Sequence, residues 1–252
     1  MMLIDSHCHI HDTQFFPEGR EEVYRRAVDA DVAMMCVGTG EADSREAVQF
    51  VTGRDNTWAV VGVHPHDTKD GWQDIGVLLS EKPAKVVGIG EIGLDYYYNH
   101  SPREVQQRAL EEQLQWALDY HLPVSFHVRE AYDDFWPIFD NFSGLRGVMH
   151  SFTDTSITLE QALRRGLYIG VNGISTFTKD AAQQLMFRQI PLEKMLLETD
   201  APFLTPKPFR GKMNEPVLVS HVAQFHADER NLSFHEIADA TTVNARELFA
   251  GL

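Results

Sequence analysis

The chain has 252 residues, of which 43% are hydrophobic and 23% are charged, a composition typical of globular proteins. This composition excludes a disordered, collagen-like or coiled-coil protein, and the length is sufficient to bury a large core. No apolar run approaches the roughly 20 residues of a membrane-spanning helix, so we expect no membrane association. The first residues, MMLIDSHCHIHD, lack the basic and apolar regions of a signal peptide, and we therefore expect a cytoplasmic protein.

Charge and cysteine content narrow the possible functions further. Lys and Arg number 22 and Asp and Glu number 37, which gives a net charge of −15. A protein that holds nucleic acid mainly by charge usually carries a basic face, so any contact with nucleic acid is expected to be local. Cys8 and Cys36 are too few for a disulfide framework and are expected to be small buried residues.

Short apolar runs alternate with amphipathic segments along the chain. Eight runs are predicted to be strands, namely residues 3–4, 32–37, 58–63, 85–89, 124–126, 147–149, 167–171 and 195–197. Apolar runs without strict alternation are typical of a parallel sheet that is buried on both faces and connected by helices. The clearest helix is predicted over residues 104–120, where apolar side chains repeat at helical spacing from Leu110. Ser233 and Glu236 form a capping box before a last helix.

The number of these units indicates the fold class. Eight strand and helix units in about 250 residues match an α/β protein built as a single (β/α)8 TIM barrel. No shift in composition marks a linker, so we expect one barrel domain over residues 1–252. The one irregular stretch, residues 201–216, contains four prolines and is expected to be a functional loop, with Pro216 in a first helical turn.

Polar residues interrupt the apolar runs at their C-terminal ends, which in a barrel meet at one mouth where active sites lie. The residues at these ends are Asp5, His7, His9, His64, Glu91, His127, His150 and Asp200. His7 and His9 are two residues apart in a predicted strand, so both rings point to the same side. Alone, such a pair is better explained by two ordinary surface or core histidines. Its combination with further ligand types at the same barrel end favours a metal site instead.

The types of ligand indicate which metals are expected. Imidazole and carboxylate groups together suit Zn²⁺, Mn²⁺, Fe²⁺ or Co²⁺ better than the all-oxygen preference of Mg²⁺ or Ca²⁺. Six ligands are too many for one catalytic ion with an open position, but they suffice for two ions if one carboxylate bridges. We therefore expect two divalent ions, with Zn²⁺, Mn²⁺ and Mg²⁺ as candidates. The first ion would take His7, His9, Glu91 and Asp200, and the second would take Glu91, His127 and His150.

These residues lie within ordered motifs that run nearly from end to end of the chain. The motifs are DSHCH (5–9), VGVHPH (61–66), GEIGLDYY (90–97), LPVSFHVREA (122–131), HSF (150–152), LLETDAPFLTPKPFRGKMNEP (196–216) and VNARELF (243–249). As a set they resemble the TatD-type metal-dependent deoxyribonucleases, a branch of the amidohydrolase-like barrels. The resemblance implies the same six metal ligands, a divalent-metal nuclease, typically a 3′-to-5′ exonuclease, and a DNA strand end as substrate. Residues 153–154 and Met213 depart from the usual family pattern and make the mouth slightly less positive.

The two predicted catalytic residues follow from what phosphodiester hydrolysis requires. Two bridged divalent ions can supply a nucleophilic water, neutralise the phosphate oxygens and assist the leaving group. Glu91 is expected to bridge the ions, and Asp200 is expected to accept or shuttle the proton of the attacking water. The ordinary alternative for Asp200 is a cap of the following turn.

Several residues are predicted to contact the substrate phosphate. His64 is expected to bind phosphate or to orient a metal ligand, with an ordinary structural role equally open. Arg129 is expected to contact phosphate, and an ion pair with a nearby carboxylate is nearly as plausible. The loop after the eighth strand adds three cations at a place where barrels often bind phosphate. These three residues are Lys207, Arg210 and Lys212.

Other polar residues near the motifs are given supporting or unrelated roles. Asp95 and Glu198 are expected to hold metal ligands in place rather than to bind the metal. His11, His66 and His100 are expected to lie in loops as solvated side chains.

Two further function classes compete with the nuclease. A hydrolase of a small ester, lactone, amide or aminoacyl bond would use the same metal core, and the charge of −15 favours it mildly. A metal-holding scaffold without activity would not need an open metal position. No obligate protein partner is expected.

Overall fold

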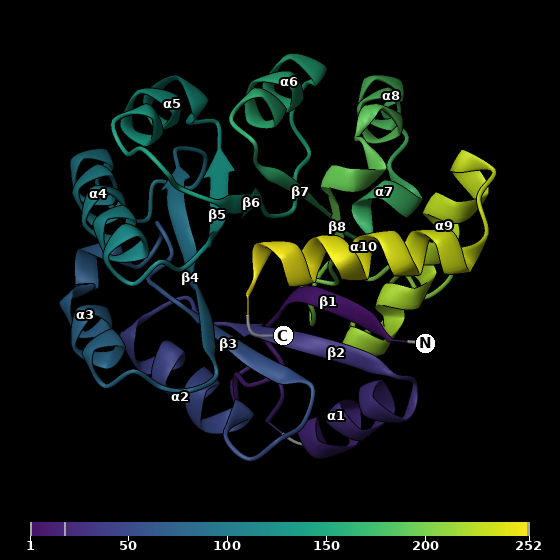
Figure 1. Cartoon of the computed structure of the whole chain (residues 1–252), viewed down its shortest axis with the longest axis horizontal. Coiled ribbons are helices and arrows are strands. Elements are labelled where there is room, and N and C mark those ends of the chain that lie inside the picture. Colours follow the sequence, from purple (N-terminus) through teal and green to yellow (C-terminus); the bar gives the residue numbers. More distant parts are fainter. Residues whose placement is uncertain (1, 18, 251–252) are drawn as a thin grey trace. The chain divides into compact units, whose positions relative to one another are not determined.

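The computed structural model describes residues 2–17 and 19–250, so residues 1, 18, 251 and 252 of the predicted domain lie outside the described part. Within this part the chain forms eight parallel strands that follow one another in sequence order in the sheet (Figure 1). The strands are β1 (Leu3–Cys8), β2 (Val32–Val37), β3 (Thr57–Val61), β4 (Val86–Asp95), β5 (Val124–Arg129), β6 (Gly147–Met149), β7 (Tyr168–Val171) and β8 (Met195–Leu197).

Helices separate most of the strands along the chain. The α-helices are α1 (Arg20–Asp29), α2 (Glu41–Val51), α3 (Gln73–Ser80), α4 (Arg103–Asp119), α5 (Tyr132–Asp140), α6 (Ser156–Arg164), α7 (Ile174–Phe177), α8 (Ala181–Gln189), α9 (Val219–Arg230) and α10 (Phe234–Leu248). The short 3₁₀ helices are η1 (Thr68–Asp70), η2 (Leu192–Lys194) and η3 (Pro216–Leu218).

All eight predicted strands are confirmed, and β2, β6 and β8 have the predicted bounds. The predicted helix over residues 104–120 is α4. The main difference is β4, which does not end with the apolar run at Ile89 but continues to Asp95. As a result Glu91 lies inside the strand rather than after it.

Contacts divide the chain into two compact units, and the first is formed by residues 1–35 and 150–248. In this unit β7 pairs with β8, with Val171 opposite Leu197. Just beyond the ends of β1 and β8, Cys8 forms a parallel bridge with Ala201. Helix α10 packs on β1 and β8 and lies beside β1 in Figure 1.

The second unit is formed by residues 36–149, joined by residues 249–250. Strands β3, β4, β5 and β6 pair here in parallel, each with the next. Helix α4 packs on β4 and helix α2 packs on β3. The ladder between β4 and β5 shifts its register between Ile89 and Ile92 and then continues to the ends of both strands, where Asp95 lies opposite Arg129.

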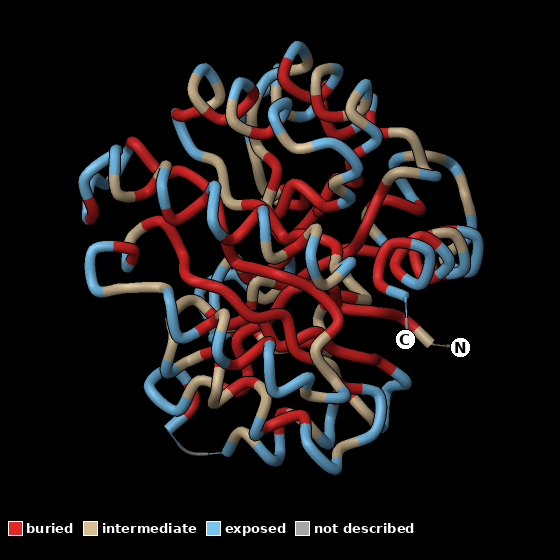
Figure 2. The backbone as a smooth tube through the Cα atoms, turned by 60° about the vertical axis from the view of Figure 1, so that its left-hand side comes forward, coloured by how far each residue is buried: buried red, intermediate tan, exposed pale blue. Residues whose placement is uncertain are grey.

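The strands carry the core of each unit. Strands β1, β2, β6, β7 and β8 are buried at every residue, and the strand segments are red in Figure 2. This is the pattern expected for parallel strands covered on both faces. Cys8 and Cys36 are buried, as predicted. In residues 2–17 and 19–250, no helix combines the length and apolar character needed to cross a membrane.

Two predicted features of the C-terminal part are also present. The Ser233 and Glu236 capping box forms, with the Glu236 N–H donating to Ser233 Oγ at 3.2 Å and the Ser233 N–H donating to Glu236 Oε2 at 2.8 Å. Pro216 occupies the first turn of η3, where its missing N–H leaves no partner unsatisfied.

Candidate active site

The first unit brings together histidines from β1 with the aspartate that follows β8. His7 lies in β1 and His9 follows it, while the Asp200 N–H donates to the His7 carbonyl at 2.9 Å. The backbone of Asp200 is left-handed, with φ 57°, an uncommon conformation that Asp tolerates better than most residues. His9 Nε2 lies 3.3 Å from Asp200 Oδ1. The β8 carboxylate is therefore fixed beside the histidine pair of β1.

His150, which follows β6, joins the same group. Its ring stacks on the ring of His7, with 3.5 Å between the centroids. His150 Nδ1 lies 3.1 Å from Glu198 Oε1, and His150 Nε2 lies 3.7 Å from Asp200 Oδ1. One ligand atom each from His7, His150 and Asp200 lies within 4.8 Å of the others, which is close enough to surround one ion.

Glu198 is placed to orient the His150 ring. Glu198 is fully buried and accepts a hydrogen bond from the Ser151 N–H at 2.6 Å. Gly170 on β7 makes room for it, because a Cβ at that position would lie 2.3 Å from Glu198 Oε2. A carboxylate on one imidazole nitrogen fixes the tautomer and directs the other nitrogen toward a metal. This arrangement fits the predicted supporting role of Glu198.

Two aspartates of this unit have shifted pKa values for opposite reasons. Burial acts to raise the pKa of Asp200, but the hydrogen bond from His9 and the charges of His150 and His7 lower it overall. Burial raises the pKa of Asp5 well above its usual value, against hydrogen bonds from Thr199. Asp5 Oδ1 accepts the Thr199 N–H at 2.8 Å. Asp5 therefore ties β1 to the end of β8, a structural role that the sequence did not reveal.

The second unit contains a matching group around His127 on β5. His127 Nδ1 lies 2.9 Å from Glu91 Oε1, and His127 Nε2 lies 3.0 Å from Asp95 Oδ2. Burial acts to lower the pKa of His127, but its hydrogen bonds to Asp95 and Glu91 raise it to about 8. Burial also acts to raise the pKa of Asp95, yet hydrogen bonds from His127 and His66 lower it overall. Asp95 contacts one ring nitrogen of His127, just as Glu198 contacts one ring nitrogen of His150. This contact fits the predicted supporting role of Asp95.

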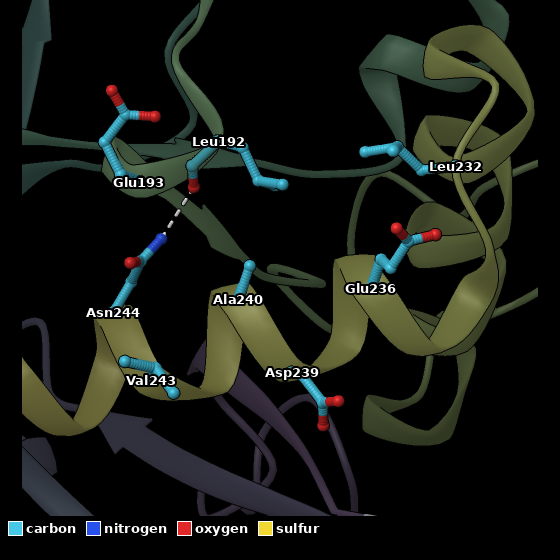
Figure 3. Close-up of a pocket in the computed structure, with 8 residues that line it drawn as sticks. All are labelled: Leu192, Glu193, Leu232, Glu236, Asp239, Ala240, Val243 and Asn244. Atoms are coloured by element: carbon cyan, nitrogen blue, oxygen red, sulfur yellow. Dashed lines mark hydrogen bonds between the residues drawn. The ribbon is translucent and has the colours of Figure 1, made fainter.

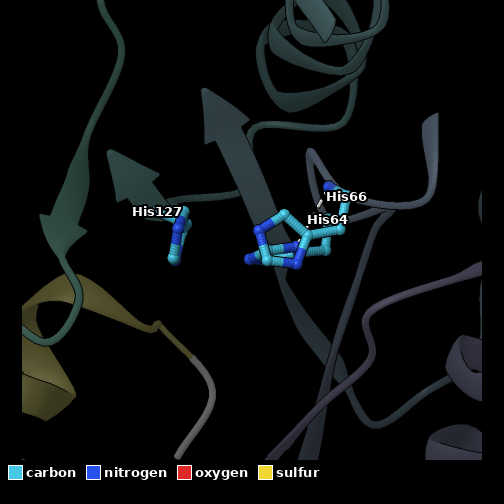
Figure 4. A group of neighbouring side chains, drawn as sticks. All are labelled: His64, His66 and His127. Atoms are coloured by element: carbon cyan, nitrogen blue, oxygen red, sulfur yellow. Dashed lines mark hydrogen bonds between the residues drawn. The ribbon is translucent and has the colours of Figure 1, made fainter. Parts of the chain in front are cut away.

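Two further histidines adjoin this group (Figure 4). One ligand atom each from His64, His66 and His127 lies within 4.8 Å of the others. His64 is buried, its Nδ1 accepts the His66 N–H at 3.2 Å, and its Nε2 lies 3.7 Å from Glu91 Oε1. Burial lowers the pKa of His64 well below its usual value. A neutral His64 whose Nε2 faces Glu91 fits an orienting role better than charge pairing with phosphate.

The structure corrects two predictions about the remaining histidines. His66 is not a solvated loop residue, because its Nε2 lies 2.8 Å from Asp95 Oδ2. The signal that could have found it is the HPH spacing, which repeats the two-residue separation of His7 and His9. His11 is fully buried rather than solvated. His100 is exposed, as predicted.

The four cations predicted to contact phosphate are all exposed, whereas His64, which was predicted with them, is buried. Lys207, Arg210 and Lys212 are exposed on the loop before η3. Arg210 is held in place, since its guanidinium lies 3.8 Å above the Phe177 ring and donates to the Thr205 carbonyl at 3.0 Å. Arg129 is exposed at the end of β5 and lies over tyrosine rings, described below.

A separate groove lies on the first unit where η2 meets α10 (Figure 3). Its volume is about 630 Å³, and Asn244 Nδ2 donates to the Leu192 carbonyl at 2.8 Å inside it. It is lined by Leu192, Glu193, Leu232, Glu236, Asp239, Ala240, Val243 and Asn244. Because η2 precedes β8, the groove lies toward the amino end of that strand, and it contains none of the predicted site residues.

The donor groups of both units suit a transition-metal ion. The first unit offers imidazole nitrogen and carboxylate oxygen in one group, and in the second unit Glu91 adjoins His127; this combination of donors suits Zn²⁺ and Mn²⁺. In each unit a buried carboxylate, Glu198 or Asp95, contacts one nitrogen of a histidine ligand candidate. Such pairs are typical of metal sites, so the residues fit the predicted divalent metal.

Comparison with known proteins gives consistent results along the whole chain. The family model described as TatD related DNase matches residues 4–250. The chain is 33% identical to the "Uncharacterized metal-dependent hydrolase YabD" of Bacillus subtilis (strain 168), over 98% of this chain and 99% of that protein. It is 36% identical to the "3'-5' ssDNA/RNA exonuclease TatD" of Citrobacter rodentium (strain ICC168), over 93% of each.

A solved structure agrees with these relatives. The crystal structure of YJJV, a TatD homologue from Escherichia coli K12, has a TM-score of 0.90 and 30% identity, and the match covers 98% of this chain and 97% of that one. Together with the strand order, this likeness confirms the predicted (β/α)8 barrel.

Proposed function

We propose that this chain, which belongs to the TatD related DNase family as its motifs predicted, is a divalent-metal-dependent nuclease that shortens single-stranded DNA from its 3′ end. A relative 36% identical to the chain is named as a 3′-5′ exonuclease of single-stranded DNA and RNA, and another as a metal-dependent hydrolase. These names support hydrolysis of a phosphodiester over hydrolysis of a small ester or amide.

The observation that carries the proposal is the setting of His150. Nδ1 of its ring lies beside Glu198, and Nε2 faces Asp200. A buried carboxylate that orients a histidine toward a second carboxylate has its ordinary explanation in metal binding. Strand ends of a barrel meet at one mouth, which supports the proposal that six residues together hold two ions. The ions would be held by His7, His9, Glu91, His127, His150 and Asp200, with Glu91 proposed to serve both.

The reaction breaks the bond between the phosphorus of the terminal nucleotide and the 3′ oxygen of the preceding nucleotide, as the oxygen of a water bonds to that phosphorus. When bound, two divalent ions make the water acidic enough to react near pH 7 and neutralise the phosphate oxygens. Asp200 accepts the proton of the attacking water, for which its lowered pKa keeps it ionised. The 3′ oxygen leaves with the shortened strand and takes a proton, and a nucleoside 5′-monophosphate is released.

The substrate phosphates would be held locally by Arg129 and by the exposed loop cations Lys207, Arg210 and Lys212. His64 would help to place Glu91. Local contact is required because the chain carries a net charge of −15, which repels a long strand. With about three phosphates contacted through the loop, log Kd should change with log salt with a slope of about 2.

Two broader statements belong to the same proposal. The family match over residues 4–250 supports a single catalytic domain. Action in the cytoplasm is proposed because two cysteines are too few for a disulfide framework.

The test uses a single-stranded oligonucleotide labelled at its 5′ end, with metal-stripped protein and added Mn²⁺, Mg²⁺ or Zn²⁺. We expect a ladder of shortened products that requires metal and a free 3′ end, and a circular single strand should resist. Asp200→Asn should lower the rate by about 10²- to 10⁴-fold. Asp239→Asn is the matched control, because Asp239 is exposed on α10.

Three outcomes would overturn the proposal. Degradation that persists in chelator would remove the metal from the mechanism. Full activity of Asp200→Asn would remove the assigned proton acceptor. Turnover of small esters or amides without cleavage of any phosphodiester would favour the competing hydrolase.

A further inference from the structure

An exposed aromatic surface follows β4 in the second unit. It consists of Tyr97, Tyr98, His100 and the guanidinium of Arg129, which we call the tyrosine platform. Tyr97 is 51% exposed and Tyr98 is 48% exposed, both high values for large rings. The two rings meet edge to face, with 4.7 Å between their centroids. Tyr98 and His100 are nearly parallel, at 7° and 5.6 Å.

The platform is fixed to the candidate active site by one carboxylate. Asp95 Oδ1 accepts the N–H of Tyr97 at 2.9 Å and the N–H of Tyr98 at 3.0 Å. The other oxygen of Asp95 lies 3.0 Å from Nε2 of His127, a proposed metal ligand. The same buried side chain therefore positions the exposed rings and the metal-binding histidine, which places the platform next to the site of cleavage.

Arg129 adds a positive charge to these rings. Its guanidinium lies 4.0 Å from the centroid of Tyr97 and 4.8 Å from that of Tyr98. A guanidinium stacked in this way keeps its N–H groups at the edge of the plane, where they can bind a phosphate. Tyr96, in contrast, is buried, and its hydroxyl donates to Asp134 at 2.8 Å, so it belongs to the packing beneath the platform.

Exposed rings beside an arginine are the usual means by which proteins hold unpaired nucleic acid, because every base offers a π face to stack on. A base pair inside a duplex keeps both faces covered by its neighbours and cannot stack on such rings. We propose that Tyr97, Tyr98 and Arg129 form a subsite for an unpaired nucleobase and its adjoining phosphate, which gives the enzyme its preference for single strands. This inference rests on the proposed function and deepens it.

The test measures binding without turnover. In an Asp200→Asn background, the affinity for a fluorescent single-stranded DNA 12-mer is measured by anisotropy, beside a 12-mer that carries abasic residues and a blunt duplex. We expect the single strand to bind more tightly than either. The double substitution Tyr97→Ala and Tyr98→Ala should weaken its binding about tenfold or more and should remove its advantage over the abasic strand. Tyr97→Phe with Tyr98→Phe, which keeps both rings, should retain that advantage.

Arg129→Gln gives an independent measurement on the same platform. Loss of one phosphate contact should lower the slope of log Kd against log salt by about 0.7, whereas loss of a purely structural arginine would leave that slope unchanged. Melting temperatures of all variants establish that each one is folded.

The results separate this inference from the function on which it rests. Equal affinity of the wild-type platform for normal and abasic strands, or an unchanged affinity in the alanine variant, would overturn the subsite. Failure of the active enzyme to cleave any phosphodiester would overturn the nuclease instead, because the anisotropy comparison does not depend on cleavage.

Discussion

Replacement of Glu198 by glutamine tests how the candidate active site holds its metal. The substitution keeps the size of the side chain in a fully buried position but removes its charge. His150 Nδ1, 3.1 Å from Glu198 Oε1, then loses its contact with a negative charge. The ring is no longer fixed in the tautomer that directs Nε2 toward Asp200.

The expected size of the effect follows from this single contact. Loss of a carboxylate that orients a metal-binding histidine weakens metal affinity by about 10- to 100-fold, or about 1.4 to 2.8 kcal/mol. Since His150 is proposed to bind one of two ions, we expect the affinity for only one of the two metal ions to weaken. The amide oxygen can still accept the Ser151 N–H, now 2.6 Å from the carboxylate, so the metal-free fold should lose only about 1 kcal/mol.

The assay is a competition titration of metal-stripped protein against a chromophoric zinc chelator, with thermal melting as the measure of folding. Glu247→Gln is the matched control, because Glu247 is exposed on α10. Two unchanged affinities in a folded Glu198→Gln protein would refute the assigned role of Glu198. Weakening of both equivalents to the same extent would refute the assignment of His150 to a single ion.

Three other changes have expected outcomes. The buried His226 has a pKa lowered to about 3 by burial, so the unfolded chain takes up a proton between pH 6.5 and 3 that the folded chain does not. Chemical denaturation should therefore show that the free energy of unfolding falls by about 2 kcal/mol between pH 7 and pH 5. This decrease should be absent in His226→Gln and still present in the exposed control His235→Gln. Gly170→Ala, whose Cβ would meet Glu198, should weaken metal binding as Glu198→Gln does, and normal zinc affinity in this variant would contradict the close approach. Ser233→Ala should cost about 1 kcal/mol in denaturation without changing nuclease activity, and an unchanged stability would show that the capping box is not needed.

The strands could be predicted because burial on both faces leaves a continuous apolar run. The prediction fell short where function interrupts that run. Strand β4 continues for six residues beyond Ile89, and this extension contains the polar residues Glu91 and Asp95. The backbone ladder with β5 persists there with a shift of register. A run of apolar residues indicates buried packing, so a prediction based on such runs stops at the first polar residue even where the strand continues.

The candidate ligands could be proposed from the sequence because each one lies in a strand or within three residues after its end. Their supporting contacts follow no such rule. His66 meets Asp95 across 29 positions of the chain, and Gly170 is required only by the carboxylate of Glu198. These pairings depend on side-chain directions in space, which a single sequence does not contain.

Each of the two units places a buried carboxylate beside a candidate metal-binding histidine. Glu198 contacts His150 in the first unit, and Asp95 contacts His127 in the second. Both carboxylates are fully buried, where an ionised group is stable only if it is paired and hydrogen-bonded. Each meets this requirement with backbone N–H groups: Glu198 accepts the N–H of Ser151, and Asp95 accepts those of the tyrosine platform. Removal of either carboxylate should therefore disturb both a histidine and the backbone next to it. For Asp95, that backbone segment carries the tyrosine rings proposed to bind the substrate, whereas for Glu198 it does not.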